Sequence, residues 1–231
     1  MWFGQNCFKS VCIRFHPWLF LFLSYDGRMR VIAGSFRSRQ LIAPRGTGTR
    51  PTSDRLRETL FNILAPRVVG CRFADLYAGT GAVGIEAISR GAEQVWFAEK
   101  ADAALAAIRA NLKALKIAHG FAVEERGTGA LLERLAKTAQ KAATESAEGA
   151  RAGDLLDLVY LDPPWEAETE YAKTLELLGS ARGRLIFAPG ALVIAEHSSK
   201  AQLAERYGEL VQTRTLKQGD AALSFYAVAD G

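Results

Sequence analysis

Four consecutive residues, Asp162-Pro163-Pro164-Trp165 (the DPPW turn), have types that suit chemistry on an amine. They follow residues 155–161, an apolar run typical of a parallel strand covered on both faces. Because two prolines cannot continue a sheet ladder, the chain must turn outward at the carboxyl edge, where open α/β sheets bind ligands. There a carboxylate and the Pro163 carbonyl would accept both N–H groups of an exocyclic base amine, and the ring would stack on the base. We therefore predict that all four residues form the catalytic site.

A glycine-rich loop separates the first predicted strand, residues 72–77, from the first predicted helix, residues 84–90. Gly79, Gly81 and Gly84 have the GxGxxG spacing, which permits a tight turn and lets a ligand lie against bare backbone at a helix N-terminus. Nicotinamide dinucleotides and S-adenosylmethionine are both bound by loops of this kind. The glycines alone therefore do not identify the cofactor.

Two acids beside this loop favour S-adenosylmethionine. Asp75 lies four residues before Gly79, where its carboxylate would face the cationic amino and sulfonium groups and would repel a pyrophosphate. Glu99 ends the second predicted strand, where it would accept hydrogen bonds from the ribose hydroxyls of either cofactor. We predict that S-adenosylmethionine is held by Asp75, Gly79, Thr80, Gly81, Gly84 and Glu99.

The elements that position these residues alternate between strand and helix. Further strands are predicted at residues 94–99, 121–125, 155–161 and 191–196, and further helices at residues 101–115, 131–139, 171–178 and 200–207. The chain ends in two strands, residues 210–216 and 222–228, joined by a hairpin signal. Residues 137–153 lack a buried apolar pattern and are expected to form a helix extension and a loop. This order predicts an α/β fold with a mostly parallel sheet that ends in an antiparallel hairpin.

The segment before this alternation is rich in arginine. A short β-hairpin is predicted from residue 30, and a helix after Thr52-Ser53-Asp54 with its apolar face at Leu56, Leu60, Phe61 and Leu64. Between residues 28 and 57 eight arginines accompany one acid. This excess suits a polyanion, since each guanidinium can neutralise a phosphate, although a solvated basic face is the alternative. The candidate contacts are Arg37, Arg39, Arg50, Arg55 and Arg57.

Composition excludes several classes of protein. With 231 residues, 49% of them apolar, the chain can fill one core, and we expect a catalytic domain at residues 67–231 with a small appendage at residues 29–66. Residues 1–28 are expected to be a disordered or misassigned extension, and no apolar run reaches the length of a membrane span. Scattered spacing predicts neither disulfides nor a metal site for Cys7, Cys12, Cys71, His16, His119 and His197.

The order of arginine-rich hairpin, residues 50–58 (RPTSDRLRE), AGTGAVGIEA and LDPPW resembles the bacterial family of small-subunit (16S) rRNA guanine-N2 methyltransferases, from Met29 to the C-terminus. The resemblance implies a Rossmann-like class I methyltransferase domain with a small N-terminal β-hairpin. It also implies cofactor contacts as above, a target base at the DPPW turn, and RNA at the arginine-bearing segment. Two departures are Trp165, where the family usually has Phe, and Arg126-Gly127-Thr128, where such enzymes often hold adenine with Asp or Asn.

We accordingly expect a cytoplasmic, monomeric enzyme whose partner is ribosomal RNA or the small ribosomal subunit, without a metal or a membrane. Three alternatives stay open at this point. An adenine-N6 methyltransferase acting on DNA or RNA would use the same amine chemistry. An NAD-dependent Rossmann oxidoreductase would use the glycine loop, and a non-catalytic RNA-binding module would use the arginines only.

Overall fold

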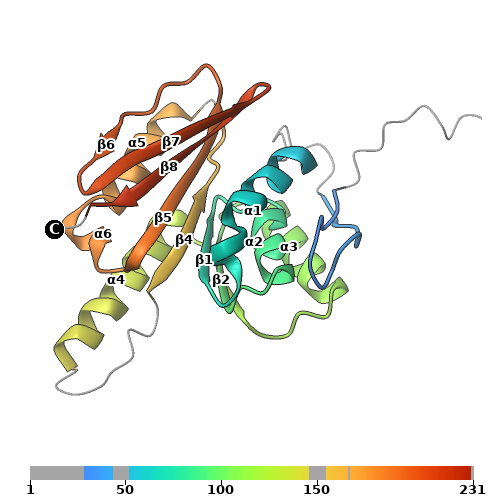
Figure 1. Cartoon of the computed structure of the whole chain (residues 1–231). Coiled ribbons are helices and arrows are strands. Elements are labelled where there is room, and N and C mark those ends of the chain that lie inside the picture. The colour runs from blue at the N-terminus through green and yellow to red at the C-terminus, as the bar shows by residue number, and fades with distance from the viewer. Residues whose placement is uncertain (1–28, 44–51, 146–154, 166, 230–231) are drawn as a thin grey trace, which may run out of the picture.

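The computed structural model describes residues 29–43, 52–145, 155–165 and 167–229 (Figure 1). The predicted extension at residues 1–28, Arg50, and the end of the predicted insertion lie outside the described residues. The elements, in chain order, are α1 (Asp54–Val68), β1 (Arg72–Leu76), α2 (Ala82–Ser89), β2 (Gln94–Ala98), α3 (Asp102–Ala114), β3 (Phe121–Glu124), α4 (Thr128–Glu145), β4 (Leu156–Leu161), α5 (Glu168–Leu178), α6 (Ala181–Arg184), β5 (Phe187–Ser198), β6 (Arg206–Tyr207), β7 (Leu210–Gln218) and β8 (Ala221–Val228).

All the strands within the described residues join one sheet in the order β3-β2-β1-β4-β5-β8-β7-β6. The first five in this order are parallel, and β8, β7 and β6 continue the sheet antiparallel. The α/β fold with a parallel sheet that ends in an antiparallel hairpin is thus confirmed. The strand order reverses between β1 and β4, so the carboxyl ends of these two strands form the crevice where such sheets bind ligands.

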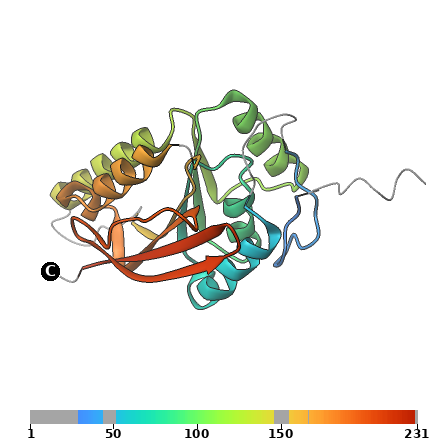
Figure 2. The same ribbon diagram turned by 90° about the horizontal axis from the view of Figure 1, so that it is seen from above.

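Helices cover both faces of the sheet and divide the core into two layers. On one face, side chains of α1, α2 and α3 pack against Phe73, Phe97 and Tyr160. On the other, α4 and α5 pack against Trp96, Val159 and neighbouring strand residues, and the two helices run side by side (Figure 2). Burial on both faces explains the nearly continuous apolar sequence of β4.

The predicted helix at residues 200–207 is wrong. Residues 201–204 have no regular structure, and Arg206–Tyr207 forms the short strand β6 against β7. Tyr207 packs its ring edge-on against Tyr226 at 5.8 Å, and its hydroxyl accepts a hydrogen bond from the Ala204 backbone N–H at 3.0 Å. These contacts to β8 and to the preceding loop outweigh the local helical propensity of the segment.

The N-terminal hairpin is smaller than predicted and packs onto helix α2. It has a single antiparallel bridge, between Arg30 and Gln40, with Val31 donating to the Arg39 carbonyl at 2.9 Å. The Glu86 carboxylate of α2 accepts hydrogen bonds from the backbone N–H groups of Ile32 at 2.7 Å and Ala33 at 3.0 Å. Residues 29–43 are thereby anchored to the helix that follows the glycine loop.

Candidate active site

The glycine loop between β1 and α2 has the backbone that its sequence predicts. Gly79 and Gly81 have φ values of 54° and 76°, in the left-handed region that favours glycine, and Gly81 is the N-cap of α2. A Cβ atom on Gly84 would lie 2.3 Å from Cε1 of Phe97, so only glycine lets α2 pack this closely on β2. The space beside Gly79 is open, because a Cβ atom there would meet nothing within 4 Å.

Asp75, at the end of β1, is buried beneath this loop. Its Oδ2 accepts a hydrogen bond from the Gly84 backbone N–H at 2.8 Å, so the carboxyl group braces the start of α2. Burial raises the pKa of Asp75 to about 8, and the Glu99 carboxylate adds to the rise while the Gly84 hydrogen bond opposes it. The sequence-based role of Asp75, facing the cofactor cation, stays a prediction; a nearby cation would favour its ionised form.

Glu99 directly follows β2 and points back at the glycine loop. Its Oε2 accepts from the Gly79 N–H at 2.8 Å, and its Oε1 accepts from Lys100 N–H at 2.8 Å and Ala101 N–H at 2.9 Å. These bonds hold the carboxylate at the backbone N–H of Gly79. Glu99 and the loop are therefore brought together, and the role of Glu99 in binding the ribose stays a prediction.

The DPPW turn leaves β4 at the same sheet edge. β4 pairs with β1 in a register that sets Leu161 opposite Leu76, and the Asp162 N–H then donates to the Leu76 carbonyl at 3.4 Å. The Pro164 carbonyl accepts from Ala167 N–H at 2.8 Å, which closes the turn. The predicted base site and the predicted cofactor loop thus lie side by side, at the ends of neighbouring strands.

The Pro163 carbonyl and the Trp165 ring have partners within the protein. Pro163 is buried, and its carbonyl accepts a hydrogen bond from the Tyr171 hydroxyl at 3.1 Å, which occupies one of its two lone pairs. Trp165 is half-buried and packs against the core layer that contains the apolar residues of α1, α2 and α3. Its role as a stacking platform stays a prediction.

Asp162 lies in a strongly acidic environment. Part of the residue is exposed, but burial of its carboxyl group raises its pKa well above the usual range, and the carboxylates of Glu196 and Asp75 raise it further. The Thr52 hydroxyl, 3.4 Å from Asp162 Oδ2, has the opposite effect on this pKa. A carboxyl group with a raised pKa has a stronger affinity for a proton than an ordinary carboxyl group, which suits it to accept one from a substrate.

Sequence reasoning missed the polar residues around Asp162. Thr52 precedes α1, Tyr160 is in β4, Tyr171 is in α5 and Glu196 is in β5, and the last three are buried. The Tyr171 hydroxyl lies 3.0 Å from the Glu196 carbonyl as well as 3.1 Å from the Pro163 carbonyl, so its single proton is shared between these two acceptors. The available signal for this network was Glu196, the one charged residue of the predicted strand at residues 191–196, because a charged residue in a buried strand usually has a partner.

The predicted arginine contacts fall into two groups. Arg37, Arg39 and Arg55 are exposed, and Arg50 lies outside the described residues. Arg57 is fully buried: its Nη2 donates to the Arg30 carbonyl at 2.5 Å and to Asp54 Oδ1 at 2.9 Å. Arg57 therefore holds α1 against the hairpin and is not available to a phosphate in this conformation, contrary to its predicted role.

After β3, the Arg126 side chain turns back onto the strand. Its Nε donates to Glu124 Oε1 at 2.8 Å, and this bond holds the pKa of Glu124 below its usual range. Arg134 of α4 also pairs with Glu124, at 3.4 Å. The departure from the family pattern at residue 126 thus forms a local ion pair at the end of β3.

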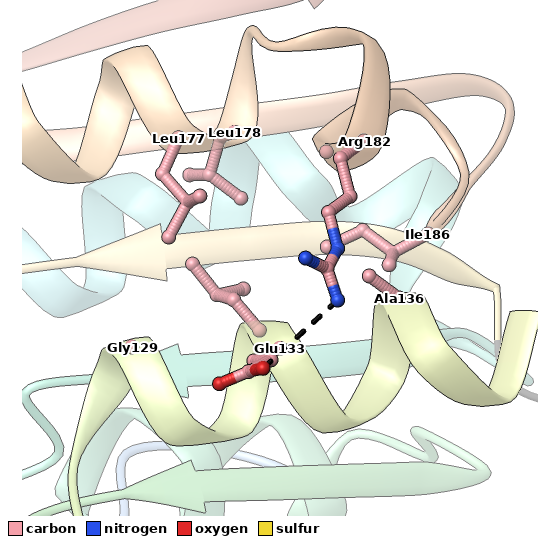
Figure 3. A pocket seen from close by; sticks show the side chains of 9 residues that line it. Gly129, Glu133, Ala136, Leu177, Leu178, Arg182 and Ile186 are labelled. Atoms are coloured by element: carbon pink, nitrogen blue, oxygen red, sulfur yellow. Dashed lines mark ion pairs between the residues drawn. The ribbon is translucent and has the colours of Figure 1, made fainter. Parts of the chain in front are cut away.

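A cavity of about 200 Å³ lies away from these residues, between α4, the end of α5, and α6 (Figure 3). Its lining is mainly aliphatic, with an ion pair between Arg182 and Glu133 at 4.0 Å. None of its lining residues belongs to the predicted site.

The described ranges contain no cluster of His, Cys, Asp and Glu side chains that could hold a metal ion. They also contain no helix that is long and apolar enough to span a membrane.

Residues 29–227 match the family model described as Conserved hypothetical protein 95. The chain belongs to this family. Among its relatives, "Putative rRNA methyltransferase YlbH" of Bacillus subtilis is 34% identical over 86% of this chain and 98% of its own length. Ribosomal RNA small subunit methyltransferase D of Escherichia coli K12 is 35% identical over 62% of this chain and 63% of its own length. The family resemblance predicted from the motifs is confirmed, and the chain is a methyltransferase.

Solved structures give the same result for the fold. "Putative methyltransferase yhhF" from Escherichia coli matches with a TM-score of 0.68 and 30% identity, over 88% of this chain and 99% of that chain. A Pyrococcus horikoshii protein, PH1948, matches at 17% identity with a TM-score of 0.59, over 82% of this chain and 93% of that chain. The predicted Rossmann-like class I methyltransferase fold is confirmed, and the oxidoreductase alternative is set aside.

Proposed function

We propose that this protein transfers a methyl group from S-adenosylmethionine to the exocyclic N2 amine of a guanine in small-subunit ribosomal RNA. One observation carries the proposal: the DPPW turn and the glycine loop lie at the ends of paired strands in a chain of this family. Cofactor and target base would meet there, with the methyl group between them. The relatives named as ribosomal RNA methyltransferases supply the substrate class.

S-adenosylmethionine fits the residues on the cofactor side. Glu99 presents a carboxylate at the Gly79 N–H, next to a glycine whose Cβ position is open, and would accept from the ribose hydroxyls. Asp75 would lie near the cationic methionine end, with the backbone of Gly79 to Gly84 between them. When bound, the cofactor supplies an electrophilic methyl group on a sulfonium.

On the base side, Asp162 and the Pro163 carbonyl would accept from the target amine. The lone pair of an exocyclic amine is delocalised into the ring, and hydrogen bonds to both N–H groups favour the pyramidal geometry that attack requires. The Trp165 ring would stack on the extruded base. An adenine N6 amine would satisfy the same acceptors, so the identity of the base rests on the family.

RNA would approach along the N-terminal segment. Arg37 and Arg39 are exposed on the hairpin, and Arg55 is exposed on the first turn of α1, close in sequence to Thr52 beside Asp162. Their guanidinium groups would contact phosphates and set the register of the RNA, whereas the DPPW turn would contact the base. Ribosomal RNA as the substrate supports a cytoplasmic location.

We further propose that the enzyme acts as a monomer. The short strand β6 covers only the first two residues of β7, and the rest of that sheet edge carries the exposed side chains of Arg214 and Lys217, charges that disfavour pairing with a second copy. Sedimentation at micromolar concentration checks this, and a dimer mass would contradict it.

Mass spectrometry of digested ribosomal RNA, from cells with and without the gene, tests the function. We expect one N2-methylguanine in small-subunit RNA to be lost with the gene and restored by the wild-type protein. Restoration by an Asp162→Asn protein would contradict the site assignment. Loss of N6-methyladenine instead would contradict the base, and an unchanged digest would contradict the reaction.

A further inference from the structure

A chain of hydrogen-bonding groups leads from the proposed base site into the protein. Thr52 Oγ1 lies 3.4 Å from Asp162 Oδ2 and 3.2 Å from the Tyr160 hydroxyl. The Tyr160 hydroxyl in turn donates a short hydrogen bond to Oε2 of Glu196. Tyr160 and Glu196 are 1% and 4% exposed, so the inner half of this chain is shielded from water.

We propose that Thr52 and Tyr160 connect the carboxyl groups of Asp162 and Glu196 into one proton-sharing unit, in which Glu196 is a positioning residue for methyl transfer. This proposal rests on the proposed function, because it assumes that Asp162 contacts the target amine. It adds three residues, from the start of α1, β4 and β5, to the machinery of the reaction.

The reaction itself creates the need for such a unit. The amine nitrogen forms a bond to the methyl carbon with its lone pair, and the carbon–sulfur bond breaks with its electron pair going to sulfur. The product nitrogen then carries a positive charge and must lose one proton. Both carboxyl groups are ionised before the transfer. Asp162 then accepts that proton, and the two hydroxyl groups pass one proton on to Glu196, so that Asp162 is ionised again and Glu196 is neutral.

The geometry permits the hydrogen bonds between Asp162 and Glu196 to point in either direction. With Glu196 ionised, Tyr160 donates to Glu196, Thr52 donates to Tyr160, and a protonated Asp162 donates to Thr52. With Glu196 neutral, all three bonds reverse, and Thr52 donates to an ionised Asp162. Either oxygen can be the donor in the Thr52–Tyr160 contact, because each hydroxyl can both donate and accept.

Because both carboxyl groups are ionised before the transfer, the surrounding charges favour uptake of one proton by the pair. Asp75, in β1, raises the pKa of Asp162 as Glu196 does, so ionisation of Asp162 beside an ionised Glu196 is unfavourable. From α1, the buried Arg57 guanidinium lies near Tyr160 and interacts favourably with negative charge there. From α5, the Tyr171 hydroxyl fixes the backbone of Glu196 and Pro163, which holds both ends of the chain in place.

The test is the pH dependence of single-turnover methyl transfer to small-subunit RNA by the full-length protein. We compare wild type, Tyr160→Phe, Glu196→Gln, the double variant and Asp162→Asn. Tyr226→Phe is the matched control, because it removes another buried hydroxyl, one that donates to the Ala204 carbonyl and belongs to the core layer on the opposite face of the sheet from Tyr160. Thermal unfolding and calorimetric binding of S-adenosylmethionine establish that each variant is folded.

We expect Tyr160→Phe, Glu196→Gln and Asp162→Asn each to lower the rate at the plateau of the pH–rate profile about 10- to 100-fold. The double variant of Tyr160 and Glu196 should be no slower than either of its single variants. Glu196→Gln removes the negative charge that raises the pKa of Asp162, so the acidic limb of its profile should move to lower pH. Tyr226→Phe should match wild type. The proposal is overturned if the acidic limb of the pH–rate profile stays in place in Glu196→Gln, or if Tyr160→Phe transfers methyl at the wild-type rate. It is also overturned if the rate reduction in the double variant equals the product of the reductions in Tyr160→Phe and Glu196→Gln. A wild-type rate in Asp162→Asn instead contradicts the proposed function.

Discussion

At the scale of single residues, the two acids near the carboxyl ends of β1 and β2 have different relations to the glycine loop. Asp75 is buried and braces the start of α2 through the Gly84 N–H, whereas Glu99 is half-exposed and accepts from the Gly79 N–H. The sequence predicted that both would contact the cofactor. It did not predict the bracing bonds, because a hydrogen bond from Gly84 back to Asp75 depends on how α2 begins.

Glu99→Ala should weaken binding of S-adenosylmethionine. Loss of charge-assisted hydrogen bonds to the ribose costs about 1.5–3 kcal/mol, or roughly 10- to 100-fold in affinity. Calorimetry measures this directly, with Glu93→Ala as the control, since Glu93 is exposed at the other end of β2. An equal affinity in Glu99→Ala and Glu93→Ala would remove Glu99 from the site.

At the scale of elements, the alternation of strands and helices was predictable because periodicity and turn residues are local. The DPPW turn was predictable for the same reason, since a buried strand followed by two prolines must end. The network around Asp162 was not, because Thr52 and Asp162 are 110 residues apart and Tyr160 and Glu196 are 36 apart. The prediction of a helix at residues 200–207 was wrong because contacts to β7 and β8, which are distant in sequence from the start of this segment, determine its conformation.

The close contact between α2 and β2 can be tested by adding one methyl group. Gly84→Ala places a Cβ atom against Phe97 and should lower the free energy of unfolding by about 1–3 kcal/mol. Gly129→Ala is the matched control, because Gly129 is in α4 with nothing within 4 Å of its Cβ position, and it should stabilise the helix by about 0.5–1 kcal/mol. Urea unfolding of both variants decides the point; equal stability would contradict the packing argument.

The hairpin and α1 form the proposed RNA-binding element. Replacing Arg37, Arg39 and Arg55 with glutamine should weaken RNA binding and reduce the slope of log K against log salt by up to about 2.7 for three contacts on a duplex. A charge-matched control replaces Arg134, Lys137 and Arg182, which are on α4 and α6. If both triple variants change the slope equally, the hairpin has no special role in binding RNA.

At the scale of the whole molecule, the cost of burying acids at one sheet edge should appear as a pH-dependent stability. Asp75 has a pKa of about 8 in the fold, well above its value in an unfolded chain, so the native state binds more protons between about pH 4 and pH 8. Its stabilising contribution is therefore complete at low pH and is lost as the pH rises through 8. Asp162 acts in the same direction.

We expect the melting temperature of the cofactor-free protein to fall between pH 6 and pH 8 at constant ionic strength. Asp75→Asn keeps an acceptor for the Gly84 N–H and cannot ionise, so it should reduce this fall. The slope from one carboxyl group is at most about 1.4 kcal/mol per pH unit. A fall of the same size in Asp75→Asn would show that other groups cause it.

The central claim is that Asp162 acts on the target amine at a site separate from the cofactor loop. Single-turnover transfer of labelled methyl from S-adenosylmethionine to small-subunit ribosomal RNA tests it most directly, with Asp157→Asn as the control, since Asp157 is at the opposite end of β4 and accepts from the Arg72 N–H. The account predicts that Asp162→Asn transfers methyl about 100-fold more slowly, with unchanged cofactor affinity, and that Asp157→Asn matches wild type. Transfer by Asp162→Asn at the wild-type rate would contradict it.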